Sequence, residues 1–246
     1  MEQTKTSTRV LLVSVIVLLV ILLTGPLGYK FGIVPLQPSL ISLLIALAGS
    51  VLVLLAGLVF LVIAIRNGQS GNRNLVLVAM VLSLVAPAIM LPQMSKARSV
   101  PPIHDITTDT DNPPAFVAIK PLRANAPNGS EYGASEAWPA EKLAATTLEA
   151  YPALSSLVSD LSVEDAVARA AAVLEEMGLE IVAVEPGEGR VEATATTFWF
   201  GFKDDVVVRV VPEDGGSRLD LRSMSRVGQS DVGVNAARIQ AFLSRF

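Results

Sequence analysis

The chain has 246 residues, of which 51% are hydrophobic, with no cysteine, one histidine and a formal net charge of −4. The absence of cysteine excludes disulfides, zinc–thiolate sites, iron–sulfur clusters and thiol nucleophiles. The charge is unevenly divided: the first 99 residues hold one acidic and seven basic residues, whereas the remaining 147 hold 22 acidic and 12 basic ones, or 12 − 22 = −10. Nucleic-acid phosphates favour basic surfaces, so we expect no nucleic-acid partner for the acidic part.

Three uncharged apolar runs occupy the first part of the chain, at residues 10–27, 40–65 and 75–91, the last with an internal proline, Pro87. A hydrocarbon core about 30 Å thick needs roughly 20 helical residues at 1.5 Å each. We therefore predict three transmembrane helices in a membrane domain of residues 1–98. Because no ionisable residue lies within the runs, we interpret them as an anchor rather than a transport path. Small residues on the second run predict close helix packing: Ala46, Ser50 and Gly57.

Basic residues that flank the runs set the expected orientation. Four lie on one side and three on the other: Lys5, Arg9, Arg66 and Arg73 against Lys30, Lys96 and Arg98. The positive-inside rule then favours a cytoplasmic N-terminus and an exported C-terminal domain. We expect a bacterial inner (plasma) membrane protein with a periplasmic or extracytoplasmic domain.

A proline-rich stretch follows the membrane domain. Residues 99–160 hold eight of the fifteen prolines, which disfavours helix interiors and central strands. We predict an extended linker that partly wraps the domain behind it, with a short helix near residues 141–149. The domain to which this stretch belongs is expected to cover residues 100–246.

Regular structure resumes in residues 161–246. Apolar residues with a 3.6-residue period predict a helix that begins after an N-cap at Ser162, and a second helix is expected from about Asp231. Four strand-like runs lie between them: 179–185, 191–200, 206–211 and 218–225. The turns "PGEG" and "EDGG" make hairpins of neighbouring runs. We predict an α+β domain, with an antiparallel sheet of four or more strands and two helices packed on one face.

Side-chain alternation in the last strand predicts one wet face. Arg218, Asp220 and Arg222 alternate with Leu219 and Leu221. The arginines near the strands and the last helix are expected to pair with neighbouring carboxylates rather than to form an anion site. They are Arg209, Arg218, Arg222, Arg226 and Arg238, with Asp204, Asp205, Asp220 and Asp231 as the acids.

The stretch "TTFWFGFKDD" (196–205) concentrates the aromatic residues. As a strand, it would place Phe198 and Phe200 on one face, packed under the helices, with Trp199 opposite. The alternative is functional: Trp199 and Phe202 would form an apolar platform for a lipid, a glycan or the edge strand of a partner. A third alternative, immersion in an anionic bilayer, is opposed by Asp204 and Asp205.

One polar cluster resembles a site, the stretch "HDITTDTDNPP" (104–114). Its oxygen and nitrogen groups suit a hard cation, but the spacing matches neither an EF-hand nor a zinc motif. Asx and Thr residues beside prolines also form turns, which is the interpretation we favour. We therefore predict no metal, no cofactor and no assigned catalytic residue.

Three stretches together are familiar: "HDITTDTDNPPAF" (104–116), "VEATATTFWFGFKDDVVVRV" (191–210) and "GSRLDLRSMSRVGQSDVGVNAARIQAFL" (216–243). They resemble a bacterial family known only as domain of unknown function 1499. The resemblance implies a membrane-associated protein with no assigned activity. It marks motif positions without roles: His104, Asp105, Asp111, Asn112, Pro113, Trp199, Asp204, Asp205, Arg209, Ser225, Arg226, Asp231, Gly233 and Asn235.

Two functional hypotheses follow. The first is a multi-pass inner-membrane protein, held in the lipid bilayer by three helices, whose C-terminal domain is an envelope binding or interaction module for an envelope protein, a lipid or a wall ligand. The alternative is a metal-dependent or His/Asp hydrolase centred on four residues: His104, Asp105, Asp109 and Asp111. The sequence favours the first, because no motif supplies partners for the histidine.

Overall fold

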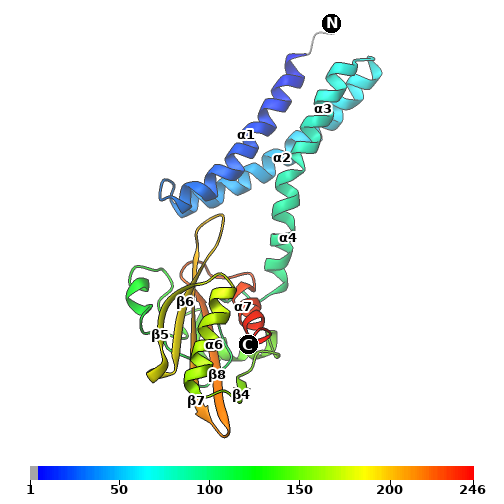
Figure 1. The fold of residues 1–246 in the computed structure, drawn as a ribbon. Helices are drawn as coiled ribbons and strands as arrows, with labels where there is room; N and C mark the ends of the chain where they lie inside the picture. Colours follow the sequence, from blue (N-terminus) through cyan, green and yellow to red (C-terminus); the bar gives the residue numbers. More distant parts are fainter. Residues whose placement is uncertain (1–4) are drawn as a thin grey trace. The chain divides into compact units, whose positions relative to one another are not determined.

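The computed structural model describes residues 5–246 (Figure 1), and the chain divides into two compact units near residue 95. The first unit is helical. It is formed by α1 (Thr6–Lys30), α2 (Leu36–Arg66), α3 (Ser70–Ser83) and the first part of α4 (Val85–Ser99). Three helical stretches are long and apolar enough to span a membrane: Thr6–Lys30, Leu36–Arg66 and Ser70–Ser99. The three predicted spans are therefore confirmed as candidate membrane helices.

Small residues bring these helices close together, as the sequence predicted. Ala46, Ser50 and Gly57 are all buried on α2. A side chain at Gly57 would meet Met80 of α3, because an added Cβ would lie 2.6 Å from Met80 Cγ. The face that α2 turns toward its neighbours thus depends on small side chains.

The third predicted span contains an interruption. A turn at Leu84 separates α3 from α4. Pro87 has no N–H to donate to the carbonyl oxygen of Ser83, four residues earlier, so the regular helical ladder breaks at this point.

The second unit is the α+β domain, built on a six-stranded antiparallel sheet. Its strands are β1 (Asp105–Thr107), β4 (Leu157–Ser159), β5 (Glu180–Glu185), β6 (Arg190–Thr196), β7 (Lys203–Glu213) and β8 (Gly216–Ser225). The order is β1-β8-β7-β6-β5, and β4 pairs with β8 further along the edge that β1 occupies. The predicted α+β class is confirmed, and two of the six strands come from the proline-rich segment.

The remaining elements are short. The small hairpin β2 (Ala134–Ser135) and β3 (Trp138–Pro139) precedes helix α5 (Ala140–Ala150), which matches the short helix predicted there. The other helices are α6 (Val163–Glu176) and α7 (Val234–Leu243), with 3₁₀ turns η1 (Lys120–Arg123) and η2 (Pro186–Glu188). Ser162 caps α6 as predicted, because its hydroxyl accepts the N–H of Asp165.

One face of the sheet carries the hydrophobic core. Side chains from α5, α6 and α7 pack there against alternate residues of the strands, including Val191, Val208 and Leu221. Both predicted helices therefore cover the same face. Burying these side chains supplies the main favourable free energy of the domain, at roughly 25 cal/mol per Å² of apolar surface.

The other face of the sheet is polar but buried, and here one prediction is wrong. Asp220 and Arg222 of β8 are 0% and 2% exposed rather than wet. The part of the proline-rich segment between β1 and β2, residues 108–133, lies over this face and is here named the covering segment; its Phe116 and Ile119 pack against Val207 and Met224. Alternation revealed which residues share a face, but it could not reveal that a distant segment lies over them.

The prediction for the aromatic stretch, residues 196–205, is also wrong. Strand β6 ends at Thr196, so residues 197–202 form the loop of the β6–β7 hairpin. Thr197 closes this loop: its N–H donates to the Phe202 carbonyl oxygen, and its hydroxyl accepts the Phe202 N–H. Phe198 is 73% exposed and does not pack under the helices. Because the strand ends at Thr196, the aromatic side chains that follow do not alternate between the two faces of the sheet.

Candidate functional site

The buried polar face is held together by ion pairs, beginning with Arg222 and Asp105. Two hydrogen bonds join them, from Nε to Oδ1 at 2.8 Å and from Nη2 to Oδ2 at 2.9 Å. Strand pairing places Asp105 opposite Met224. Met224 is two residues from Arg222, so all three side chains lie on the same face of the sheet. Phe116 covers the pair, with its ring centroid 5.0 Å from Arg222 Cζ. A bidentate pair of this kind fixes β1 against β8.

A second ion cluster surrounds Asp205 of β7. Arg226 donates two hydrogen bonds to its carboxylate, Arg123 donates one at 2.6 Å, and the Thr194 hydroxyl donates another. Burial by itself raises the pKa of Asp205, but the bonds from Arg226, Thr194 and Arg123 outweigh it and hold the pKa below its ordinary value. Burial also lowers the pKa of Arg123, and the hydrogen bond and charge of Asp205 oppose that shift.

Sequence reasoning missed Arg123. It lies in η1 within the segment interpreted as linker, where no periodic pattern points to a buried charge. Its guanidinium also donates to the carbonyl oxygens of Met224, Ser225, Asn128 and Gly129. This one side chain therefore ties the covering segment to the end of β8.

Glu192 of β6 was also missed. Its fully buried carboxylate accepts the backbone N–H groups of Val117, Ala118 and Ile119, and it pairs with Arg190. The covering segment has no strand partner there, so a carboxylate satisfies its amide groups instead. Glu192 thus holds the backbone of residues 117–119 against β6.

The predicted turn at "HDITTDTDNPP" is present. Asp109 Oδ1 accepts the N–H groups of Asp111 and Asn112, and Asp109 Oδ2 accepts from Arg209. Arg209 also pairs with Asp220 and donates to the carbonyl oxygen of Asn112. The turn is thus pinned to β7. Within residues 5–246, no group of three or more His, Cys, Asp or Glu side chains is arranged to hold a metal ion.

The start of α7 forms a third polar cluster. The N-cap of α7 is Gly233, and the Asp231 carboxylate just before it accepts the N–H groups of Gly233 and Asn235, which have no partner within the helix. Asn235 is fully buried and donates to the His104 carbonyl oxygen and the Ser225 hydroxyl. Arg238 pairs with Asp204. The predicted pairing of arginines with carboxylates is confirmed for these residues.

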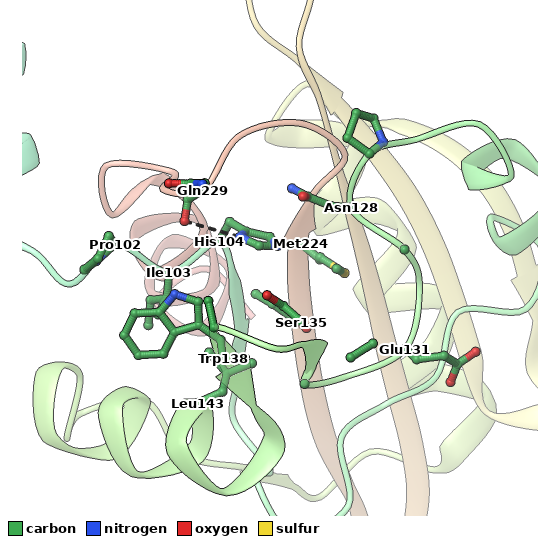
Figure 2. A pocket seen from close by; sticks show the side chains of 16 residues that line it. Pro102, Ile103, His104, Asn128, Glu131, Ser135, Trp138, Leu143, Met224 and Gln229 are labelled. Carbon is green, nitrogen blue, oxygen red and sulfur yellow. Dashed lines mark hydrogen bonds between the residues drawn. The ribbon is translucent and has the colours of Figure 1, made fainter.

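A cavity of about 450 Å³ opens beside these clusters (Figure 2). It lies between the start of β1, the β2–β3 hairpin, the start of α5 and the loop after β8. Sixteen residues line it: Pro102, Ile103, His104, Asp105, Pro127, Asn128, Gly129, Glu131, Gly133, Ala134, Ser135, Ala137, Trp138, Leu143, Met224 and Gln229. The volume is within the roughly 300–1,000 Å³ usual for small-molecule sites.

His104 and Asp105 are the predicted site residues that line the cavity. His104 Nδ1 lies 3.4 Å from the Gln229 carbonyl oxygen, a contact that favours the tautomer with its proton on Nδ1. The other candidate motif or interaction positions lie outside the lining: Asp111, Asn112, Trp199, Phe202, Asp204, Asp205, Arg209, Arg226, Asp231 and Asn235. Sequence reasoning missed Asn128, Ser135 and Trp138, which carry no motif of their own.

The motif segments at residues 104–116, 191–210 and 216–243 meet across the buried polar face, and they do so within one domain. A family model described as "Protein of unknown function (DUF1499)" matches residues 105–246, which is more than half of the chain. The chain belongs to the DUF1499 family. No curated protein and no solved structure matches it.

The DUF1499 match covers residues 105–246, so it includes β1, the covering segment and the three helices α5, α6 and α7 that pack on the sheet. Six motif positions of this DUF1499 chain form ion pairs or accept backbone N–H groups at the start of α7: Asp105, Asp204, Asp205, Arg209, Arg226 and Asp231.

Proposed function

We propose that this protein is a multi-pass inner-membrane protein whose C-terminal domain lies on the exported side and binds a ligand of the cell envelope. The observation that supports this most is the cavity beside His104, since a preformed hollow with an apolar wall and a few polar groups is the usual form of a binding site. The expected orientation rests on the four-to-three division of flanking basic residues.

Rigidity of the cavity walls supports a binding role. Asp105 at the cavity is fixed by Arg222, and the neighbouring His104 has its carbonyl oxygen held by Asn235 and by the N–H of Ser225. Met224, which also lines the cavity, lies in β8 two residues after Arg222. A site held by packed, hydrogen-bonded side chains binds without first having to order itself.

The hydrolase hypothesis receives less support. Of its four residues, Asp105 and Asp109 already form ion pairs with Arg222 and Arg209. Asp111 lies outside the cavity lining, which leaves His104 with no unengaged carboxylate among its proposed partners. A general base of the His–Asp type needs a carboxylate within hydrogen-bond reach of the imidazole.

The test is native mass spectrometry of the full chain purified in lipid nanodiscs from the membranes of its own cells. We expect a bound small molecule on the unaltered chain. Ser135→Leu places a larger apolar side chain in the cavity and should remove the adduct. Ser155→Leu makes the same change at an exposed serine outside the cavity and should retain it. Identical adduct levels in both variants, or no adduct on any chain, would contradict the binding role.

A further inference from the structure

The charges around the cavity indicate what kind of ligand it can hold. Of the sixteen residues in the lining, none is lysine or arginine. Both acids pair with bases outside the lining, Asp105 with Arg222 in a buried pair and Glu131 with Lys120 in a solvent-exposed pair at 2.8 Å. An anionic ligand would therefore find no cationic side chain, and a cationic ligand would compete with ion pairs already formed.

Uncharged side chains supply the hydrogen-bonding groups considered for a ligand, from Asn128, His104 and Ser135. Both N–H bonds of the Asn128 amide are used, by the carbonyl oxygens of Ser225 and Gly228, which leaves its Oδ1 as an acceptor. With its proton on Nδ1, His104 offers Nε2 as a second acceptor. The Ser135 hydroxyl can donate or accept. These groups match a ligand that carries several hydroxyls.

Apolar side chains gather on one side of the cavity, where Ile103 and Leu143 lie near the ring of Trp138, and Met224 lies beside His104 and Asn128 (Figure 2). Lys142 Nζ lies 4.2 Å from the centroid of that ring, so the indole is held in place from outside the cavity lining. A fixed indole beside aliphatic side chains suits the C–H face of a saturated ring.

We propose that the cavity binds an uncharged saccharide, with the C–H face of a sugar ring against the Trp138 wall and its hydroxyls toward His104, Asn128 and Ser135. This inference rests on the proposed binding function and names its ligand class. Free sugars and the sugars of a wall polymer share this chemistry, so both are included in the test.

The chain offers a direct optical probe. It contains two tryptophans, so Trp199→Phe leaves Trp138 as the sole indole. The full-length Trp199→Phe chain is placed in phosphocholine-lipid nanodiscs, because a maltoside detergent would itself present a sugar. Cellobiose and N,N′-diacetylchitobiose are titrated as neutral disaccharides, with glucose 6-phosphate and glucosamine as charged comparisons. A chitin hexasaccharide tests whether the disaccharide is accepted within a polymer.

We expect a saturable change in Trp138 fluorescence with at least one neutral disaccharide. In the same background, Ser135→Leu should weaken this binding by about tenfold or more, whereas Ser155→Leu should leave it unchanged. Binding of the hexasaccharide as well would indicate a wall polymer, and binding of the disaccharide alone a free sugar.

The proposal is overturned if no neutral saccharide binds, if glucose 6-phosphate binds as tightly, or if Ser135→Leu has no effect. If the saccharides fail while the Ser135-dependent mass adduct is present, the ligand class is wrong and the binding function stands. If the adduct is also absent, both proposals fail.

Discussion

Arg222 and Asp105 form a two-bond ion pair in which the side chains are 2% and 4% exposed. Arg222 also donates to the carbonyl oxygens of Pro114 and Ser130, so one guanidinium joins β8, β1 and the covering segment. Removing one member of a buried pair leaves the other charge without compensation, which is more costly than removing both.

We predict that Asp105→Ala destabilises the domain by about 3–5 kcal/mol, because it strands the Arg222 charge. For a domain of this size, each kcal/mol corresponds to about 2–4 °C in the unfolding midpoint. The midpoint is measured on the full chain in nanodiscs by Trp138 fluorescence in the Trp199→Phe background. The double variant Asp105→Leu/Arg222→Met should lose less than Asp105→Ala, and an equal or greater loss would contradict the argument.

A matched surface pair provides the control for that prediction. The control variant is Glu176→Ala, which disrupts an exposed pair with Arg169 away from the cavity. The pair of Lys120 and Glu131 is similarly exposed, at 61% and 70%, but Glu131 lines the cavity. Solvent screens such pairs, so this variant should change the stability by less than about 1 kcal/mol.

Acid should weaken the domain through Asp205. Its pKa is lower in the folded protein than the ordinary 3.8, because the hydrogen bonds from Arg226, Thr194 and Arg123 outweigh the effect of burial. A carboxylate with a depressed folded pKa stabilises the fold above its unfolded pKa and loses that contribution as the pH falls through the folded value. We expect the unfolding midpoint to fall as the pH drops below about 3.8, with a shallower decline in Asp205→Asn. Asp214→Asn, at an exposed turn, should keep the original slope.

Glu192 should control the opening of the covering segment. Its carboxylate accepts the N–H groups of Val117, Ala118 and Ile119. Glu192→Gln replaces one acceptor oxygen by a donor group, so we expect faster hydrogen exchange at these three amides, by about tenfold or more. Glu188→Gln, at an exposed member of the same hairpin, serves as the comparison. Unchanged exchange at residues 117–119 would show that the segment is held by other contacts.

Gly189 should tolerate no side chain. Its φ is +60°, and an added Cβ would lie 2.0 Å from the Val210 carbonyl oxygen. We expect Gly189→Ala to cost about 2 kcal/mol or more in stability. Gly187 in the same turn has open space around it, so Gly187→Ala should be nearly neutral. Thermal unfolding of the two variants compares them directly, and similar midpoints would contradict the steric argument.

The orientation of the chain can be tested without removing any native thiol, since the sequence has no cysteine. Asp214→Cys places a thiol in the β7–β8 turn, and Asn67→Cys places one between α2 and α3. If the C-terminal domain is exported, a membrane-impermeant maleimide should label position 214 in intact spheroplasts and position 67 only after permeabilisation. The reverse pattern would contradict the proposed location.

Much of the secondary structure could be predicted because its causes are local. The apolar runs, the N-cap at Ser162 and the hairpin turn at Gly189 each depend on residues that are neighbours in sequence. The pairing of Arg209 with Asp220 was also predictable, since both lie on adjacent strands of one hairpin. The loop at residues 197–202 was not, because aromatic residues favour strands and only the Thr197–Phe202 hydrogen bonds reveal the closure.

The candidate site was less accessible to sequence reasoning. His104 and Asp105 were identified as polar residues of interest, but Asn128, Ser135 and Trp138 were not. These three come from a segment without periodicity, and they reach the cavity because the covering segment and the β2–β3 hairpin return to the end of β8. A cavity is a property of several segments at once, and local patterns do not describe it.

The sequence by itself determined where apolar helices form, which residues alternate along the strands and how the hairpins turn, because those features follow from hydropathy and backbone geometry over a few residues. Only the tertiary structure decided that Arg123 would meet Asp205, 82 positions away, and that the polar face of the sheet would be buried. The physical reason is that an ion pair in a protein interior depends on which distant segment excludes water from it, and no local period records that choice.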